Sequence, residues 1–296
     1  MTELMAYPAT TAPPGLQAGS GPSVAATDDL AERAIRVRER IIEMCAGSTG
    51  GHLGGSMSLV EILLVLYFDV LRMDPDAPAD PARDLLLLSK GHGVLCLYAV
   101  LAERGFLPAA SLADYGRPGG PFMAHPNPAL PGVEMPSGAL GHGLPIGVGA
   151  ALDARLSGSD RRVVVVLGDG ELQEGSVWEA AMAASSLKLS GLTAVVDRNR
   201  LQITGTTESV IGLEPLEERW RAFGWTVRAV DGHDPGELRE ALTVPPELDR
   251  PTVVLARTTK GRGLPYVEDR LVSHFAKLGE RERRRALAAV RTGSRP

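Results

Sequence analysis

The chain has 296 residues, 44% of them hydrophobic and 4% aromatic, so it is long enough to bury the core of one large domain or two modest ones. Its 31 basic and 36 acidic residues give a net charge of −5, which excludes the dominant basic surface of a nucleic-acid binder. The longest apolar runs, such as Ile62–Phe68 and Val163–Leu167, are far shorter than the roughly 20 residues that span a bilayer. We therefore expect no membrane segment, and small molecules or other proteins as partners.

The first residues differ in composition from the rest of the chain. Residues 1–27 are rich in Ala, Pro, Gly, Ser and Thr and lack the basic-then-apolar order of a secretory signal. We predict a disordered N-terminal tail over 1–27, one domain over 28–296 and a cytoplasmic location. Cys45 and Cys96 stand alone in apolar helical patterns without metal-ligand spacing, and both are predicted to be core thiols.

Helical and strand patterns alternate along the domain. An apolar period of 3.6 predicts helices over Leu30–Cys45, Leu59–Leu71, Val94–Arg104, Leu144–Leu156, Val177–Leu187, Pro215–Phe223 and Glu237–Leu242. Short runs rich in β-branched residues predict buried strands at Val163–Leu167, Thr193–Asp197, Thr226–Val230 and Thr252–Ala256, and a further short apolar strand precedes His92. The alternation predicts an α/β fold, a doubly wound and mostly parallel sheet with helices on both faces.

Ligands of such sheets bind beyond the carboxyl ends of the strands. The loops that begin at Gly168, Arg198 and Thr258 each follow a predicted strand, so we expect all three to converge on one crevice. A long Gly- and Pro-rich segment lies between Arg104 and Leu144, and a loop of this length usually binds a ligand or is disordered. We predict that it binds one.

The loop at Gly168 carries an acidic residue between two glycines. Asp169 follows a buried strand and precedes a helix, so backbone N–H groups and a helix N-terminus can face an anion there, as a diphosphate site requires. Asn199 adds an amide oxygen and Leu201 a backbone carbonyl, and with Asp169 these hard donors suit Mg²⁺. An ordinary strand-to-helix turn, with Asn199 capping a loop, is the alternative for this pattern on its own.

Several short motifs carry a family resemblance. Gly168-Asp169-Gly170-Glu171 followed by Arg198-Asn199-Arg200 is similar to the thiamine diphosphate motif. In order and approximate spacing, the chain also resembles transketolases at Thr49-Gly50-Gly51-His52, Ser89-Lys90-Gly91-His92-Gly93, Ala124-His125-Pro126, Gly138-Ala139-Leu140-Gly141-His142-Gly143, Leu172-Gln173-Glu174-Gly175 and Thr258-Thr259-Lys260-Gly261. The resemblance covers residues 30–280.

The resemblance implies thiamine diphosphate and Mg²⁺ as cofactors, with Ca²⁺ or Mn²⁺ as possible substitutes for the metal. It places the metal on the Asp169 carboxylate, the Asn199 amide oxygen and the Leu201 carbonyl. It implies that further cofactor contacts come from His92, Gly138, Ala139, Leu140, Gly170, Glu171 and His274.

The resemblance also assigns roles to histidines, which in glycine-rich loops are otherwise surface or capping residues. It implies that His52 shuttles protons beside the substrate oxygen and that His125 binds the donor's hydroxyls. His92 is assigned to the diphosphate end, and His274 to both cofactor and substrate, although it lies about one residue further from Thr259 than in the family. His233 is predicted to be structural.

Other positions depart from the family or are less specific. His142 stands where many transketolases have Gln, which puts any hydrogen bond there in doubt and leaves substrate choice open. The resemblance implies that Glu174 and Glu179 belong to a proton network between the two active sites of a dimer. The basic run Arg281–Arg285 is predicted to be the solvated face of a C-terminal helix, with a docking surface for the partner as the alternative.

A full transketolase is more than twice as long as this chain. The resemblance places the Glu that activates the cofactor in a second, pyrimidine-binding domain, so we expect the partner to be a C-terminal transketolase subunit, in a heterotetramer of two chains of each kind. The implied reaction moves a two-carbon ketol unit from a ketose, often phosphorylated, to an aldose. The alternatives are a thiamine enzyme with a 2-oxo acid donor, which the series of histidines disfavours, and a non-catalytic cofactor-binding subunit.

Overall fold

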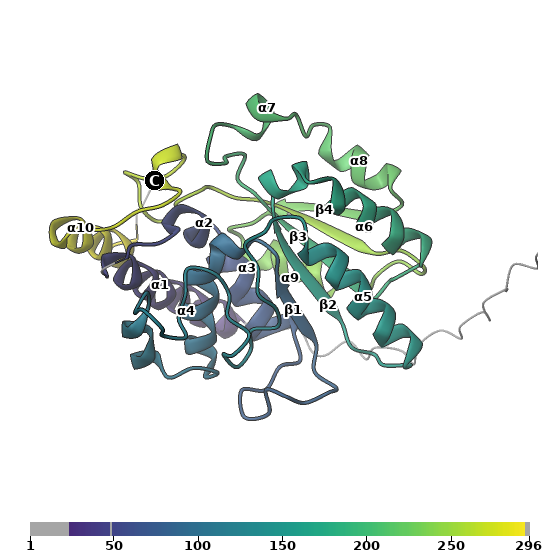
Figure 1. Ribbon diagram of the computed structural model, residues 1–296, viewed down its shortest axis with the longest axis horizontal. Coiled ribbons are helices and arrows are strands. Elements are labelled where there is room, and N and C mark those ends of the chain that lie inside the picture. The colour runs from purple at the N-terminus through teal and green to yellow at the C-terminus, as the bar shows by residue number, and fades with distance from the viewer. Residues whose placement is uncertain (1–23, 48, 294–296) are drawn as a thin grey trace, which may run out of the picture.

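The structure is a computed structural model that describes residues 24–47 and 49–293 (Figure 1). Most of the predicted tail, residues 1–23, lies outside this part of the chain. Residues 24–27 are described and open the first helix, α1 (Val24–Ala46), which therefore begins before the predicted start at Leu30. The division into a tail and one domain over 28–296 stays a prediction.

The framework is a sheet of five strands in the order β1-β2-β3-β5-β4, and every neighbouring pair is parallel. The strands are β1 (Leu85–Leu88), β2 (Val163–Gly168), β3 (Leu192–Arg198), β4 (Thr226–Asp231) and β5 (Thr252–Arg257). Each of the four strands predicted with bounds is found to within one residue at either end. The predicted parallel α/β architecture is confirmed.

The strands are apolar because helices cover both faces of the sheet. In β2 every residue is buried, and successive side chains enter opposite cores: Val164 and Val166 join one cluster, Val163 and Val165 the other. Fully burying a valine of this kind contributes roughly 1.5–3 kcal/mol. The continuous apolar run that indicated a doubly covered strand is thus explained by the two layers of helices.

The helices divide between these two layers (Figure 1). One core contains residues of α1, α2, α3, α4, α9 and α10, and the other contains residues of α5, α6 and α8. Their bounds are α2 Leu53–Met57, α3 Val60–Val65, α4 Val94–Arg104, α5 Gly143–Leu156, α6 Gly175–Ser186, α7 Thr207–Val210, α8 Leu216–Ala222, α9 Pro235–Thr243 and α10 Glu280–Arg291.

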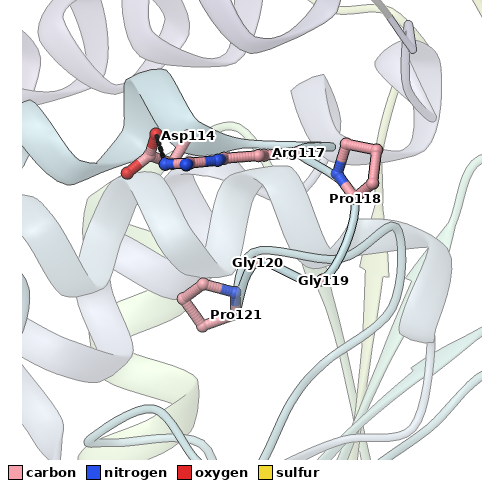
Figure 2. Close-up of a pocket in the computed structure, with 6 residues that line it drawn as sticks. All are labelled: Asp114, Arg117, Pro118, Gly119, Gly120 and Pro121. Carbon is pink, nitrogen blue, oxygen red and sulfur yellow. Dashed lines mark ion pairs between the residues drawn. The ribbon is translucent and has the colours of Figure 1, made fainter.

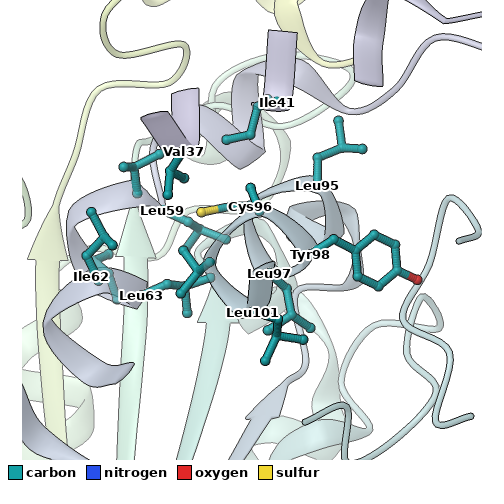
Figure 3. Packing of buried hydrophobic residues seen from close by; sticks show 14 of the residues in the cluster. Val37, Ile41, Leu59, Ile62, Leu63, Leu95, Cys96, Leu97, Tyr98 and Leu101 are labelled. Atoms are coloured by element: carbon teal, nitrogen blue, oxygen red, sulfur yellow. The ribbon is translucent and has the colours of Figure 1, made fainter. Parts of the chain in front are cut away.

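The first core is built around α4, where Cys96 lies among residues of α1 and α3 such as Val37 and Leu63 (Figure 3). Both cysteines are free and buried, which confirms the prediction of core thiols. Burial raises the pKa of the Cys45 thiol to about 12, so it stays protonated and unreactive.

The second core depends on one close approach between α5 and β2. A Cβ at Gly147 would lie 2.4 Å from Val165 Cγ2, so only glycine lets this helix pack so near the strand. Trp220 and Trp225 are fully buried in the same core, with ring centroids 4.9 Å apart. Both tryptophans are therefore core residues.

Three local features differ from the expectations. The predicted helix Leu59–Leu71 is α3 followed by a π-helical turn, η1 (Leu66–Val70), and the short helices α2 and α7 had no separate prediction. Turns of 3₁₀ helix lie at Gly91–Gly93, Ala109–Asp114, Gly170–Gln173 and Leu271–Ser273. Among the described residues, no helix combines the length and apolar character needed to cross a bilayer.

Candidate functional site

The loops after β2, β3 and β5 meet at one edge of the sheet. Arg198, at the end of β3, pairs with Arg257 of β5. The Asp169 amide donates to the Asp197 carbonyl at 3.3 Å, and the Thr258 amide donates to the Arg198 carbonyl at 3.2 Å. The predicted convergence of these loops is confirmed, and it follows from the parallel register of neighbouring strands.

The Asp169 carboxylate lies at the centre of this edge and is only 2% exposed. Its Oδ1 accepts from the Gly170 amide at 2.8 Å, and its Oδ2 accepts from Arg198 Nη1 at 3.3 Å and from the Arg200 amide. Burial, and then repulsion from Asp197, raises the pKa of Asp169. The protein therefore balances the negative charge of Asp169 only in part.

Two further oxygen donors lie on the neighbouring loop. The Asn199 carboxamide oxygen accepts from the Leu201 amide at 3.1 Å, and the Leu201 carbonyl accepts from Lys260 Nζ at 3.2 Å. A carboxylate offers about four acceptor positions, of which Asp169 uses three within the protein. The three residues predicted as metal ligands thus gather hard oxygens, with remaining lone pairs, beside an incompletely balanced negative charge.

Lys260 is a site residue that the sequence analysis missed. Its side chain comes from the loop after β5, is 2% exposed, and places Nζ 3.2 Å from the Leu201 carbonyl and 3.4 Å from His274 Nδ1. Burial, and then repulsion from Lys90, lowers the pKa of Lys260 to about 8. The loop was singled out for its place after a strand, but a lysine is usually exposed and nothing local indicated that this one points inward.

Four histidines from separate loops face one another beside this edge. The ring centroid of His52 lies 4.5 Å from that of His92, 5.9 Å from that of His125 and 5.4 Å from that of His274. A pair of backbone hydrogen bonds between Gly51 and Ala276 holds the first and last of these loops together. The structure therefore brings together all four histidines that the resemblance assigned to the site.

Their surroundings keep three of these imidazoles uncharged. Burial, followed by repulsion from the other histidines and from Lys260, lowers the pKa of His52 to about 3. Burial and nearby cations likewise lower the pKa of His92 and that of His274 to about 4. A neutral imidazole offers one donor and one acceptor, and the buried Nδ1 of His52 has no hydrogen-bond partner among the described residues.

The positive electrostatic potential of the neighbouring lysines also decides which kind of ligand this cluster favours. His52, His92 and His274 bring one ring nitrogen each within 4.8 Å of one another, a spacing that a transition metal could bridge. The ammonium groups of Lys90 and Lys260, however, are among the charges that lower the pKa of His92 and His274, and they oppose any added cation in the same way. An anion with polar oxygens suits this potential better.

The Gly138-Ala139-Leu140 segment lies against the histidines. Gly138 has φ +142°, and a Cβ there would lie 2.5 Å from Cδ2 of His125, so this backbone and this contact both require glycine. A Cβ on Gly91, the neighbour of His92, would lie 2.8 Å from the Gly138 amide nitrogen. Contact of these residues with a cofactor stays a prediction, but the segment borders the cluster.

Glu171 holds two glycine loops together. Its carboxylate is buried, and it accepts from the Ser89 hydroxyl, from the Gly141 amide at 2.9 Å and from the Gly168 amide at 3.0 Å. Burial raises the pKa of Glu171. The carboxylate thus links the loops of Ser89 and Gly141 to the end of β2, and its predicted contact with a cofactor stays a prediction, as does that of Gly170.

Two surface hollows lie outside the cluster. One, about 350 Å³, is lined by Met135, Pro136, Ser137, Ala139, His142 and Ile146, and the exposed His142 keeps Nδ1 3.0 Å from the Leu140 carbonyl. The other, about 240 Å³, is lined by Asp114 and residues 117 to 121, with Arg117 paired to Asp114 at 3.5 Å (Figure 2). None of the four clustered histidines lines either hollow.

Comparison with known proteins identifies relatives over most of the chain. The family model "Transketolase, thiamine diphosphate binding domain" matches residues 30–292. One relative, a component of the apulose-4-phosphate transketolase of Phocaeicola vulgatus, is 42% identical over 232 residues, 78% of this chain and 83% of that protein. Another, a component of the 6-deoxy-6-sulfo-D-fructose transketolase of a Clostridium species, is 40% identical, and the match covers 88% of this chain and 96% of that protein. Both relatives are named as subunits of their enzymes.

Solved transketolase structures also resemble this chain. A transketolase of Pichia stipitis superposes with a TM-score of 0.82 at 28% identity, and that of Campylobacter jejuni does so with the same score and identity. The matches cover 87% and 91% of this chain but only 40% and 43% of those proteins. The chain thus spans well under half the length of these solved relatives.

Proposed function

Because this chain belongs to the transketolase family, as the thiamine diphosphate-binding N-terminal part of such an enzyme, we propose that it transfers a two-carbon ketol unit from a ketose to an aldose together with a second subunit. The observation that carries the proposal is the position of four histidines beside the oxygen donors Asp169, Asn199 and Leu201. This position would join a metal and diphosphate site to imidazole donors and acceptors that a ketose could use.

The described residues offer suitable groups for the metal ion and for the diphosphate of the cofactor. The partly balanced charge of Asp169, with the oxygens of Asn199 and Leu201, suits Mg²⁺, which prefers oxygen ligands and retains diphosphate oxygens and water. Lys260 and His92 offer donors to a diphosphate. When bound, thiamine diphosphate supplies the carbanion chemistry of ketol transfer.

The chain's own histidines would form hydrogen bonds with the substrate. His52, with an unpartnered buried Nδ1 and a pKa near 3, stays neutral at physiological pH, so it can accept a hydrogen bond from a hydroxyl of the donor ketose or donate one to it. His125 sits on the long loop between α4 and α5, where Tyr98 donates to its carbonyl at 3.0 Å and so orients the segment. We assign His52, His125 and His274 to the donor ketose and His92 to the diphosphate.

The remaining part of the active site would come from a partner. Relatives of nearly the same length are named as transketolase subunits, and this chain spans about 40% of a solved transketolase, so we propose a heterotetramer with a pyrimidine-binding C-terminal subunit. The two free, buried cysteines agree with a reducing, cytoplasmic location.

An enzyme acting on a 2-oxo acid is the second candidate. Lys260, whose Nζ lies 3.4 Å from His274 Nδ1, could hold the carboxylate of such a donor, but three of the four clustered imidazoles are neutral and offer the donors and acceptors that ketose hydroxyls need. A non-catalytic subunit is disfavoured because all three metal-ligand positions are kept. The histidine cluster therefore favours the ketose.

The first test is calorimetric titration of thiamine diphosphate with Mg²⁺ into this chain, alone and with the pyrimidine-binding subunit, followed by a ketol-transfer assay. We expect tight binding and turnover of a ketose phosphate only in the mixture, because the site needs groups from both subunits. Turnover of a 2-oxo acid instead would support the second candidate, and no binding in either sample would contradict the proposed function.

A further inference from the structure

One histidine outside the cluster makes two contacts that a simple loop residue would not need. His233 follows β4, and its Nδ1 lies 3.0 Å from Glu61 Oε2 on α3. Its Nε2 accepts from the backbone amide of Thr259 at 2.8 Å. Since an amide nitrogen only donates, Nε2 carries no proton, and the proton sits on Nδ1 and is donated to Glu61.

Glu61 is in turn fixed by an arginine. Arg38 of α1 donates from Nη2 to Glu61 Oε1 at 2.7 Å, and both side chains are nearly buried. Although burial alone would raise it, the pKa of Glu61 is lowered to about 2 by Arg38 and by the hydrogen bond with His233. Glu61 therefore remains a charged acceptor that holds the imidazole in one orientation.

The same arginine reaches the loop after β5 from the other side. Arg38 Nε donates to the Arg262 carbonyl at 3.3 Å, while His233 accepts from Thr259. The segment 259–262 is thus held by a hydrogen bond at each end, and Glu61 connects the two side chains, His233 and Arg38, that make these bonds. Lys260 lies between these two hydrogen bonds, and its ammonium donates to the Leu201 carbonyl.

We infer that His233 is a positioning residue that acts through Lys260, setting where its ammonium meets the diphosphate and metal corner of the site. This role rests on the proposed function, which supplies the cofactor. His233 itself contacts Glu61 and Thr259 and none of the proposed metal ligands. Outer partners of this kind typically change ligand affinity 10- to 100-fold when they are removed.

The arrangement distinguishes this role from plain loop support. Gly261 has φ +82°, and its amide donates to the Gly54 carbonyl at 3.0 Å, so the loop turns sharply next to Lys260. A shift at Thr259 is therefore passed to a side chain that is 2% exposed and has little free space. Loss of the His233 contact should let Lys260 leave its buried position.

The first arm of the test needs no cofactor. The rate at which trinitrobenzenesulfonate modifies Lys260 is followed by peptide mass spectrometry in wild type, in His233→Leu and in Arg239→Leu. The last variant is a matched control, because Arg239 forms a similarly buried ion pair with Asp69 at 2.6 Å that does not touch the loop. We expect several-fold faster modification in His233→Leu alone, and equal rates in all three proteins would overturn the inference.

The second arm measures thiamine diphosphate affinity in the two-subunit enzyme. His233→Leu should weaken binding about 10-fold, and His233→Gln should recover most of it, because its carboxamide can accept from Thr259 and donate to Glu61. In a Lys260→Met background, His233→Leu should have almost no further effect, whereas an undiminished effect there would show a role not exerted through Lys260.

The two arms separate the inference from the proposed function. If the wild-type enzyme binds no thiamine diphosphate, the proposed function fails, and the modification rates alone decide whether His233 positions Lys260. If the wild type binds the cofactor normally and His233→Leu does too, the inference fails while the proposed function stands.

Discussion

Two aspartates at neighbouring strand ends lie in opposite electrostatic surroundings. Asp197, fully buried in β3, accepts from Lys90, from Thr258 and from the Ser58 hydroxyl at 2.6 Å. Burial alone would raise the pKa of Asp197, but Lys90 and the hydrogen bonds outweigh it and hold that pKa below its ordinary value. At Asp169 burial prevails, and the pKa is raised.

The difference indicates that the charge of Asp197 supports the fold, whereas that of Asp169 suits the metal site proposed above. The ionised form of Asp197 is favoured in the folded state, so its charge stabilises the fold. The ionised form of Asp169 is disfavoured there, so its charge costs stability unless a cation binds beside it. A metal-binding role for Asp169 predicts this contrast: its charge destabilises the fold until a cation binds, whereas the neighbouring Asp197 already has Lys90 as its partner.

The largest expected effect comes from replacing each aspartate by alanine. Asp197→Ala leaves the Lys90 ammonium buried without its partner and should lower the free energy of unfolding by about 3–5 kcal/mol. Asp169→Ala should change that energy by no more than about 1 kcal/mol, because Arg198 keeps Glu208 and Glu214 as partners. Urea unfolding of the cofactor-free chain measures both.

The same pair of variants separates stability from binding. Asp169→Ala should weaken Mg²⁺-dependent binding of thiamine diphosphate by more than about 100-fold, beyond the usual effect of losing an outer partner of a metal ligand. The exposed Asp160, replaced by alanine, serves as control for the loss of one negative charge. If Asp169→Ala binds the cofactor as wild type does, the metal site is elsewhere.

A smaller effect is expected in the histidine cluster. His125→Ala should slow turnover of the ketose donor by about 100-fold, the lower range for loss of a group that handles protons, with cofactor affinity nearly unchanged. Tyr98→Phe is the matched control, since it removes the 3.0 Å bond to the His125 carbonyl but keeps the imidazole, and it should cost only a few-fold. Steady-state kinetics with a ketose phosphate decide, and wild-type rates in His125→Ala would remove it from the donor site.

The sequence predicted the strands and the convergence of their loops because β-branched runs and parallel register leave little choice. The proposed metal ligands and the four histidines of the cluster came from the family resemblance, whose motifs lie within single loops. Lys260 and the contact of His233 with Thr259 escaped prediction because both depend on which way a side chain turns between segments far apart in the chain. The bonds of Glu171 to Ser89, Gly141 and Gly168 likewise depend on tertiary packing that no local pattern records.

The smallest effect concerns the pH dependence of stability. The pKa of His52 is near 3 in the folded chain and near 6.5 in the unfolded chain, so between these values the unfolded state binds more protons. Stability from this group is complete above pH 6.5 and is lost as the pH falls toward 3. His52→Gln removes that proton uptake, so its free energy of unfolding should fall less than that of wild type between pH 7.5 and pH 5, as measured by urea unfolding. Replacing the exposed His142 by glutamine should leave the fall unchanged, and an equal fall in His52→Gln and wild type would mean that His52 is not held neutral by the cluster.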